Sequence, residues 1–383
     1  MTDVDAVALA LFGAPRRPLL AAILRHLLGR PLPEVDDLAA RGAHEPVLEW
    51  ACRLTAPDVS PDAEAARLRS DATTLISLGR ADGQRPVALG GAEYPAALAE
   101  IADPPACLWV RGRIDACARP RRVAVVGARA ASRQGLEVAA GLAAGLARAG
   151  VVVVSGLARG VDGAAHRAAL DAGGVSVAVL GSGLDRLYPR EHHELARRLA
   201  EAGAVLSEHP PGTPPLAYHF PARNRIISGL VSAVVVVEAS EKSGSLITAA
   251  AALDQGREVM AVPGPVAPGR HRGAHALLKD GARLVESASD VLVELGWEDP
   301  AGAAAGGHSP DLGVYADLGL PHGTDEFSAD DVVAGTGWPL SQVVARLGTL
   351  EIEGRIQRIG CGRYLGLRGN WRDDKPKKFN GLD

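Results

Sequence analysis

RVAVVGARAASRQG, residues 122–135, joins a valine-rich run to a glycine turn and then to a serine at the start of a helical segment. The run has no polar alternation, which is typical of a strand buried on both faces of a parallel sheet. Similar runs, each followed by a turn and in most cases by a helical segment, recur to about residue 296: VVVVSG, SVAVLG, AVLSE, AVVVVEA, EVMAVPG and ARLVES. Such strand–helix repetition predicts an α/β fold with an extended Rossmann-like parallel sheet as its core.

The sequence on either side of this core predicts smaller domains. Residues 1–80 carry apolar side chains at helical spacing and predict an N-terminal helical domain, and residues 81–296 form the Rossmann-like core. Residues 297–314 are rich in Gly, Ala and Pro, which indicates a linker. Two helical segments and a hairpin follow, so residues 315–368 predict a winged-helix domain, and the polar end, 369–383, predicts a disordered tail.

Composition argues against several classes of protein. The formal net charge is −4 over 383 residues, so no global basic field draws the chain to nucleic acid, and any anion site must be local. The four cysteines have no CxxC or zinc-type spacing, which indicates a reducing cytoplasm, and neither a metal nor a cofactor is predicted. We find no signal-peptide pattern and no uncharged apolar run near ~18 residues, so we expect a soluble cytoplasmic protein.

The turn after the first strand carries features of an anion site. Gly127 permits a tight turn, Arg129 supplies a cation, and Ser132 can cap a helix whose free N–H groups attract anions. Arg129 stands where a dinucleotide fold has its second glycine, and the second strand ends in SGLARGVD rather than in an acid. NAD binding is therefore disfavoured, whereas phosphate binding is not.

FPARNRIISGL, at positions 220–230, places Arg223 and Arg225 in what we expect to be a loop before another buried strand. Their guanidinium groups can pair with an internal carboxylate such as that of Glu208 or Glu238, or they can bind an anion that arrives from outside. The loop that follows the same strand bears on this choice.

That second loop, EASEKSGSLITAA at 238–250, combines Lys242 with the hydroxyl groups of Ser243 and Ser245 just before a helix. Hydroxyls, an ammonium group and free backbone N–H groups are typical of a phosphate cradle. Arg129, Lys242 and the two arginines of FPARNR would bring four cations to one rim, which is not expected unless phosphates neutralise them. The sequence therefore predicts that both arginines bind an external phosphate.

Six segments of the core resemble, in order, the conserved blocks of the DNA-processing protein A (DprA/Smf) family: VAVVGARAASRQG, VVVVSGLARGVDGAAHRAAL, VAVLGSGLDRLYP, LSEHPPGTPPLAYHFPARNRIISGL, VVEASEKSGSLITAAAALDQGREVMAVPG and RGAHALLKDGA. The resemblance covers about residues 90–290. The N-terminal helices are similar to that family's helical (SAM- or HhH-like) domain, and the C-terminal segment is similar to its winged-helix domain.

This resemblance implies a protein without catalytic activity that binds single-stranded DNA regardless of sequence. It also implies dimerisation through the α/β core and the loading of a RecA-type recombinase during natural transformation. By position, it implies DNA contacts from Gly127, Arg129, Ser132, Ser155, Gly156, Gly181, Phe220, Arg223, Asn224, Arg225, Lys242, Ser243, Gly244 and Ser245.

Two other classes of function stay open at the level of sequence. Related α/β folds hydrolyse nucleoside monophosphates with a glutamate in a PGGxGTxxE loop; the comparable stretch, EKSGSLITAA, has none inside its helix, although Glu238 just before it is an acid that such a reaction could use. A winged-helix repressor would need the missing dinucleotide site. Because PLSQVVARLGTLEIE sets Arg346 against Glu351 and Glu353, we expect the winged helix to contact protein, or to contact DNA only weakly.

Overall fold

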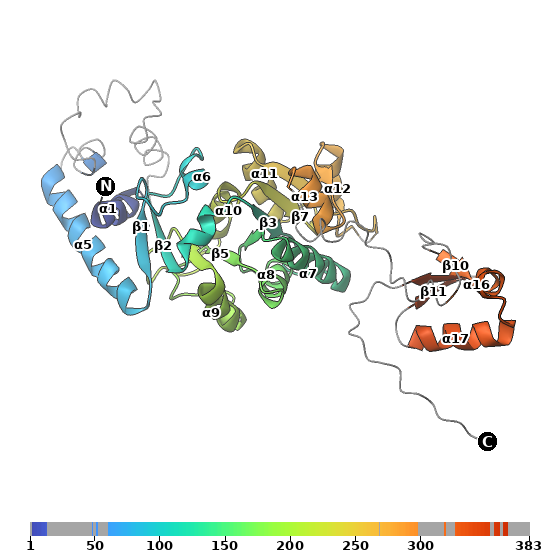
Figure 1. Cartoon of the computed structure of the whole chain (residues 1–383). Coiled ribbons are helices and arrows are strands. Elements are labelled where there is room, and N and C mark those ends of the chain that lie inside the picture. Colours follow the sequence, from blue (N-terminus) through green and yellow to red (C-terminus); the bar gives the residue numbers. More distant parts are fainter. Residues whose placement is uncertain are drawn as a thin grey trace, which may run out of the picture. The chain divides into compact units, whose positions relative to one another are not determined.

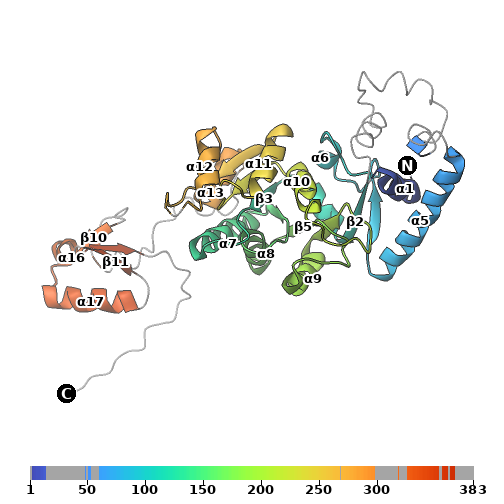
Figure 2. The same ribbon diagram turned by 180° about the vertical axis from the view of Figure 1, so that it is seen from behind.

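The computed structural model describes residues 2–13, 48, 51–52, 60–267, 269–297, 318, 326–352, 356–360 and 363–366. It divides into two compact units, Met1–Ala301 and Gly302–Asp383, which are described separately (Figures 1 and 2). The predicted tail and all but the first residue of the predicted linker lie outside the described residues. Among the helices of the described ranges, none combines the length and the apolar character that a bilayer-crossing segment needs.

A large sheet forms the centre of the first unit. Its described strands lie in the order β1-β2-β6-β5-β4-β3-β7-β8-β9. The strands from β6 to β9 are parallel, which confirms the prediction from the valine runs, and β1 and β2 extend the sheet antiparallel at one edge. The strands are β1 (Arg85–Ala88), β2 (Cys107–Gly112), β3 (Arg122–Val126), β4 (Val152–Ser155), β5 (Ser176–Leu180), β6 (Ala204–Ser207), β7 (Ala233–Val236), β8 (Glu258–Ala261) and β9 (Arg283–Leu284).

Helices cover both faces of this sheet, because alternate residues of the central strands point into two separate apolar cores. Val123 and Val125 of β3 pack with α7, α8 and α13, whereas Ala124 and Val126 belong to the core that includes α10 and α11. Figures 1 and 2 show α7 and α8 side by side, apart from α10 and α11. The bounds are α6 (Ala96–Ala99), η1 (Ile114–Ala118), α7 (Arg133–Arg148), α8 (Val161–Asp171), η2 (Arg190–His192), α9 (His193–Ala202), α10 (His219–Gly229), α11 (Ser245–Asp254), α12 (Arg272–Lys279) and α13 (Ala288–Glu294).

The described part of the N-terminal region is helical, as its apolar spacing indicates. α1 (Asp3–Gly13) and α5 (Pro61–Ala81) pack against each other, and both contact β1. Proline suits the first turn of α5 because the N–H it lacks would have no partner within the helix. Buried residues of both helices join the same apolar core as β2 and β6, so these helices extend the core of the sheet.

The second unit has the outline of a winged helix, as predicted. α16 (Ala329–Thr336) and α17 (Leu340–Ile352) pack beside a small antiparallel sheet of β10 (Glu326–Ser328), β12 (Arg363–Gly366) and β11 (Ile356–Gly360). Ser328 and Asp331 form a capping box that begins α16, and Gly337 ends it in the left-handed conformation. Phe327 and Tyr364 are buried in a small apolar core within the second unit.

Candidate nucleic-acid interface

A cavity of ≈ 470 Å³ opens beyond the carboxyl ends of β3 and β7. The chain runs from β3 out to β6 and returns to β7 on the other side of β3, so this is the point where the strand order reverses and where open α/β sheets bind ligands. A smaller cavity of ≈ 130 Å³ adjoins it, and Arg129, Ala158, Phe220 and Arg223 line both.

The structure brings most of the predicted contact residues to these cavities. The main cavity is lined by Gly127, Arg129, Phe220, Arg223, Asn224, Ser243, Gly244 and Ser245, and Gly156 lines the smaller one. The remaining predicted residues, Ser132, Ser155, Gly181, Arg225 and Lys242, line neither.

FPARNR is part of helix α10 and not of a loop as expected. Pro221 lies in the first turn, where a missing N–H breaks no helical hydrogen bond. Residues two positions apart on an α-helix project about 200° apart, so Arg223 and Arg225 leave α10 on nearly opposite sides. They therefore meet different surroundings.

Arg223 faces the cavities. It is only 5% exposed, and its guanidinium group donates to the carbonyl oxygens of Gly156 (Nη1–O 2.8 Å) and Val179. No carboxylate of the described residues forms an ion pair with it. Burial lowers the pKa of Arg223 to about 10, an effect that nearby Asp162 opposes and Arg129 increases. Its charge is thus held at the cavity without full neutralisation from inside the protein.

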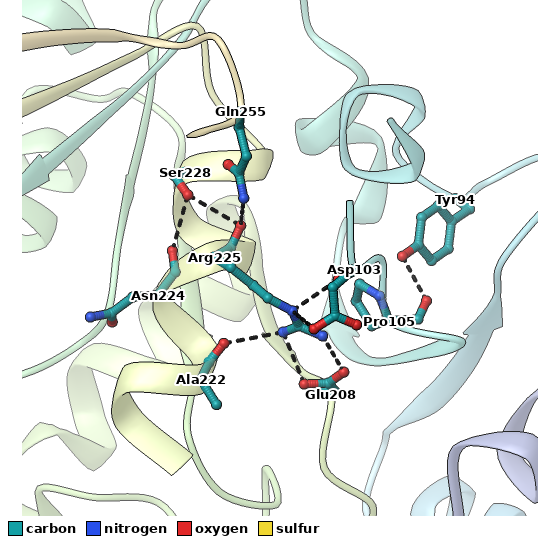
Figure 3. A network of polar contacts seen from close by, with 9 residues as sticks. All are labelled: Tyr94, Asp103, Pro105, Glu208, Ala222, Asn224, Arg225, Ser228 and Gln255. Atoms are coloured by element: carbon teal, nitrogen blue, oxygen red, sulfur yellow. Dashed lines mark hydrogen bonds and ion pairs between the residues drawn. The ribbon is translucent and has the colours of Figure 1, made fainter. Parts of the chain in front are cut away.

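Arg225, by contrast, has its partners inside the protein, which corrects the prediction of an external phosphate. Its Nη2 and Nη1 atoms donate to Oε1 (2.5 Å) and Oε2 (3.0 Å) of Glu208, and Nε donates to Oδ2 (3.0 Å) of Asp103 (Figure 3). Burial lowers the pKa of Arg225, but Glu208 and Asp103 outweigh that effect and the net shift is upward. The side chain is 13% exposed and joins three segments of the scaffold.

The start of α7 already holds an internal anion. Glu238, which is 1% exposed, accepts hydrogen bonds from Oγ (2.6 Å) and N (3.1 Å) of Ser132 through its Oε2 atom. The Ser132 hydroxyl in turn accepts from the N–H of Gly135 (3.0 Å). The expectation that this helix start would attract an external anion is therefore corrected, because the carboxylate of Glu238 occupies it.

The start of α11 is different. Its N-cap residue, Gly244, provides no side-chain hydrogen bond to the helix, and the hydroxyl oxygens of Ser243 and Ser245 lie 2.8 Å apart at the cavity wall. Asn224 Nδ2 donates to the Gly244 carbonyl (3.2 Å), which holds α10 against this turn. The N–H groups of the first turn have partners in the turn itself, since that of Ser245 donates to the Ser243 hydroxyl (3.4 Å) and that of Leu246 to the Ser243 carbonyl (3.1 Å). The positive end of the helix dipole and the two hydroxyl groups nevertheless favour an anion at this wall. Lys242 beside it is exposed and forms no ion pair with any described residue.

Two predicted glycines have a packing role. A Cβ atom at Gly156 would lie 2.5 Å from the guanidinium nitrogens of Arg223, and one at Gly181 would lie 3.1 Å from Cδ1 of Phe220. Each glycine therefore makes room for a side chain of α10 that borders the cavities. Ser155 is structural as well, since its hydroxyl donates to the Val125 carbonyl (2.7 Å).

Asp162 and His166 do not form a joint site, although they share a helical face. Asp162 accepts hydrogen bonds from the N–H groups of Gly156 (3.1 Å) and Ala158 (3.4 Å), whereas His166 Nδ1 lies 2.7 Å from Oγ of Ser176. In the ranges that the structure describes, no three metal-ligating side chains gather. Burial raises the pKa of Asp162, partly offset by the charge of Arg223.

Sequence reasoning missed several residues that border the cavities, among them Arg270, Arg159 and Tyr188. Arg270 lines the main cavity, donates to the Ala130 carbonyl (2.9 Å) and lies 3.7 Å from Glu238. Arg159 and Tyr188 line the smaller cavity. Arg159 and Arg270 lie in loops, and nothing in the sequence distinguishes them from other loop arginines.

Comparisons with known proteins agree with this architecture. The family model "DNA recombination-mediator protein A" matches residues 86–296, and the model of the DprA winged helix domain matches residues 312–360. Protein Smf of Escherichia coli is 45% identical over 287 residues, which cover 72% of this chain and 75% of that protein. The DNA processing protein DprA of Streptococcus pneumoniae is 48% identical over 201 residues, which cover 52% of this chain and 71% of that protein.

Solved structures show the same likeness. The X-ray structure of the Streptococcus pneumoniae protein superposes with a TM-score of 0.65 at 35% identity, covering 77% of this chain and 98% of that one. DNA processing protein A of Helicobacter pylori, whose structure concerns its single-stranded DNA binding mode, superposes with a TM-score of 0.51 at 28% identity, covering 55% of this chain and 95% of that one. This chain belongs to the DNA recombination-mediator protein A family.

Proposed function

We propose that this chain binds single-stranded DNA, with the backbone phosphate of one nucleotide in the main cavity. The observation that carries the proposal is the state of Arg223, a buried cation that lines the cavity without an ion pair to any described carboxylate. Arg129 and the start of α11, with the hydroxyl groups of Ser243 and Ser245, line the same space. The Helicobacter pylori relative, whose structure concerns single-stranded DNA binding, supports the choice of ligand.

The form of the site favours a single strand over a duplex and phosphate over base identity. A cavity of ≈ 470 Å³ has room for parts of one nucleotide but not for two paired strands. Guanidinium and hydroxyl groups recognise phosphate oxygens, which carry no sequence information. Phe220, which packs against Arg129 with its ring centroid 5.1 Å from the guanidinium carbon, offers a stacking surface that every base can use.

In its cellular role, the bound strand would be handed to a RecA-type recombinase in the cytoplasm during DNA uptake and natural transformation. The protein would act as a homodimer that associates through the α/β core. Membership of the recombination-mediator family supports this assignment. The test is the rate at which the recombinase forms filaments on DNA coated with single-strand-binding protein, with and without this chain; an unchanged rate contradicts the loading role.

Catalysis is not part of the proposal. Glu238, the acid that a hydrolase would need, lines the main cavity, but it is 1% exposed and its oxygens already accept hydrogen bonds from the backbone and hydroxyl of Ser132. A general base needs an oxygen within hydrogen-bond reach of the attacking water. Glu238 serves instead as the internal anion of α7.

A binding titration tests the central claim. Fluorescent 20-nucleotide single strands and the matching duplex are compared at equal salt, with Arg133→Ala as a control because Arg133 is 93% exposed on α7 and lines neither cavity. The single strand should bind more tightly. Equal or tighter duplex binding contradicts the proposal, and steady turnover of nucleoside monophosphates in a parallel assay would favour the hydrolase alternative.

A further inference from the structure

Two arginines lie at the amino ends of the parallel strands, the opposite edge of the sheet from the main cavity. Arg122 begins β3, and Arg257 directly precedes β8. β7 lies between these strands, with Val123 paired to Ala233 and Ala233 paired to Glu258. Arg122 and Arg257 therefore stand one residue before paired positions. Because side chains alternate along a strand, both point to the face of the sheet that α10 and α11 cover.

The two guanidinium groups donate to carbonyl oxygens of two helices on that face. Arg122 Nε donates to the carbonyl of Leu230, the residue that caps the end of α10 (2.5 Å), and Arg122 Nη1 donates to the Arg119 carbonyl. Arg257 Nη2 donates to the Ala97 carbonyl in α6 (3.1 Å). Because α6 and α10 contact each other, these bonds bring the two arginines to one place (Figure 1).

The protein does not neutralise this pair of cations. Among the described residues, neither arginine has an ion-pair partner, and the Nε atom of Arg257 is buried without a hydrogen-bond acceptor. The carboxyl end of a helix supplies only about half a negative charge. Burial lowers the pKa of Arg122, and the charge of Arg257 lowers it further. The nearby thiol of Cys117 adds no negative charge, because burial raises its pKa to about 12.

We propose that Arg122 and Arg257 bind a phosphate group at the amino ends of β3 and β8. Nη2 of Arg122 and Nη1 of Arg257 donate to no described residue, so each guanidinium group keeps N–H donors for a ligand. Both side chains are partly exposed, so an anion can reach them from solvent. A phosphate accepts hydrogen bonds from two guanidinium groups at once. Because this site lies at the other edge of the sheet, it does not rest on the proposed function.

Thermal melts of the full chain in inorganic phosphate test the site, with sodium chloride at the same ionic strength as the reference. Arg223→Ala serves as the background, because it removes the buried cation of the main cavity. Phosphate should raise the Tm of this variant by about 3 °C, since a ligand that binds the folded state stabilises it. Adding Arg257→Gln should abolish the rise. Adding Arg148→Gln should preserve it, because Arg148 is exposed at the end of α7.

Further melts separate a phosphate site from an arginine that only caps a helix. In chloride, Arg257→Gln should melt at or above the wild-type Tm, because it removes one of two cations that repel each other. Arg257→Lys keeps the charge and should restore part of the phosphate rise. Acetate at the same ionic strength should raise the Tm less than phosphate does. A phosphate rise that survives Arg257→Gln, or an equal rise in acetate, overturns the proposal.

The phosphate can be free or part of a DNA strand, and oligonucleotide length distinguishes these sources. Wild type and Arg257→Gln are titrated with single strands of about 6 and about 40 nucleotides. If the phosphate belongs to a strand, Arg257→Gln should weaken binding of the longer strand alone and flatten its salt slope by about 0.7. Unchanged binding of the longer strand beside a lost phosphate rise identifies a free phosphate. Loss of neither overturns the proposal. A wild type that binds neither strand but still responds to phosphate contradicts the proposed function and leaves this site standing.

Discussion

The two sides of α10 use arginine in opposite ways. On one side Arg223 is buried against carbonyl oxygens at the cavity, without an ion pair to a described carboxylate. On the other side Arg225, almost as buried, is enclosed by Glu208 and Asp103 (Figure 3). The difference teaches that burial of a charge does not identify a ligand site. A buried charge that the protein leaves without an ion pair does.

The Arg225 side has a mechanical consequence for the cavity side. Arg225 joins α10 to the chain before β2 through Asp103 and to the chain after β6 through Glu208. Gln255 Nε2 donates to the Arg225 carbonyl (3.0 Å), which ties the end of α11 to the same helix. These contacts therefore fix α10 and α11, which both line the main cavity.

Arg225→Ala should produce the largest effect, and it should be on stability. The change leaves Glu208 and Asp103 without the cation that joins them, at a cost of about 3 kcal/mol, so the Tm should fall by roughly 5–10 °C. The slope of log K against log salt for single-stranded DNA should stay the same, because no phosphate contact is lost. Thermal melts and salt titrations measure both. The control Arg133→Ala should keep the wild-type Tm to within about 1 °C.

Arg223→Ala should affect DNA binding instead. Charge-assisted hydrogen bonds contribute about 1.5–3 kcal/mol, so the affinity for single-stranded DNA should fall about 10- to 100-fold. The salt slope should flatten by about 0.7, the value for one phosphate contact on a single strand. Titration at several salt concentrations decides this, with Arg225→Ala measured in parallel. An unchanged slope would place Arg223 with the scaffold and would remove the contrast between the two sides.

Asp162→Asn should strengthen binding on the cavity side. Asp162 offsets the charge of Arg223, so its removal should tighten single-stranded DNA binding on the order of fivefold, about 1 kcal/mol. The matched change on the other side, Glu208→Gln, should lower the Tm and leave the affinity unchanged. Weaker binding by Asp162→Asn in a fully folded variant would contradict this account.

The same variant has a pH signature. Burial raises the pKa of Asp162, so the folded state favours the neutral carboxyl group. The stability that this group contributes is present at low pH. It is lost as the pH rises from the pKa of Asp162 in the unfolded chain to its higher pKa in the folded protein. The Tm of Asp162→Asn relative to wild type should therefore increase between pH 4 and pH 7. Asn can still accept the hydrogen bonds from Gly156 and Ala158. A Tm difference that falls with pH contradicts the raised pKa.

The smallest effect should come from removing the winged helix. Within the described second unit, α17 sets Arg346 against Glu351, so its charge offers little attraction to phosphate. A chain that ends at Ala301 should keep its affinity for single-stranded DNA to within about twofold. Anisotropy titration of the truncated and full chains at equal salt measures this. Loss of most of the affinity by a folded truncation would show that the cavity side of α10 does not act alone.

The sequence predicted those features that depend on residues close together in the chain, namely the buried strands and the place of the cavity. Valine runs such as VAVV define strands buried on both faces, and ligands of parallel sheets bind at the carboxyl ends, so the cavity beside Gly127 and Arg129 lies where expected. The two arginines of FPARNR could not be separated, because in a loop both would reach one rim and only a helical register sends them apart. The Asp103 partner of Arg225 is 122 residues away in sequence.

Long-range partners also explain the other differences between sequence and structure. The turn that ends at Ser132 has the residue types of an anion-binding helix start, but the anion there is the carboxylate of Glu238, 106 residues later. The family resemblance implies a DNA contact at Gly156, yet the absence of a side chain there makes room for Arg223, which lies 67 residues later in the chain. Strand order and the antiparallel edge of β1 and β2 likewise depend on pairing that no local pattern encodes.

The carboxylate of Glu238 occupies the start of α7 and so competes there with any external anion. In dinucleotide-binding relatives of this architecture, the corresponding helix start receives the pyrophosphate of the cofactor. Here that position is filled by the carboxylate of Glu238, which a free nucleotide would have to displace. A dinucleotide should therefore compete poorly for the start of α7, which keeps the metabolic state of the cell from setting its occupancy.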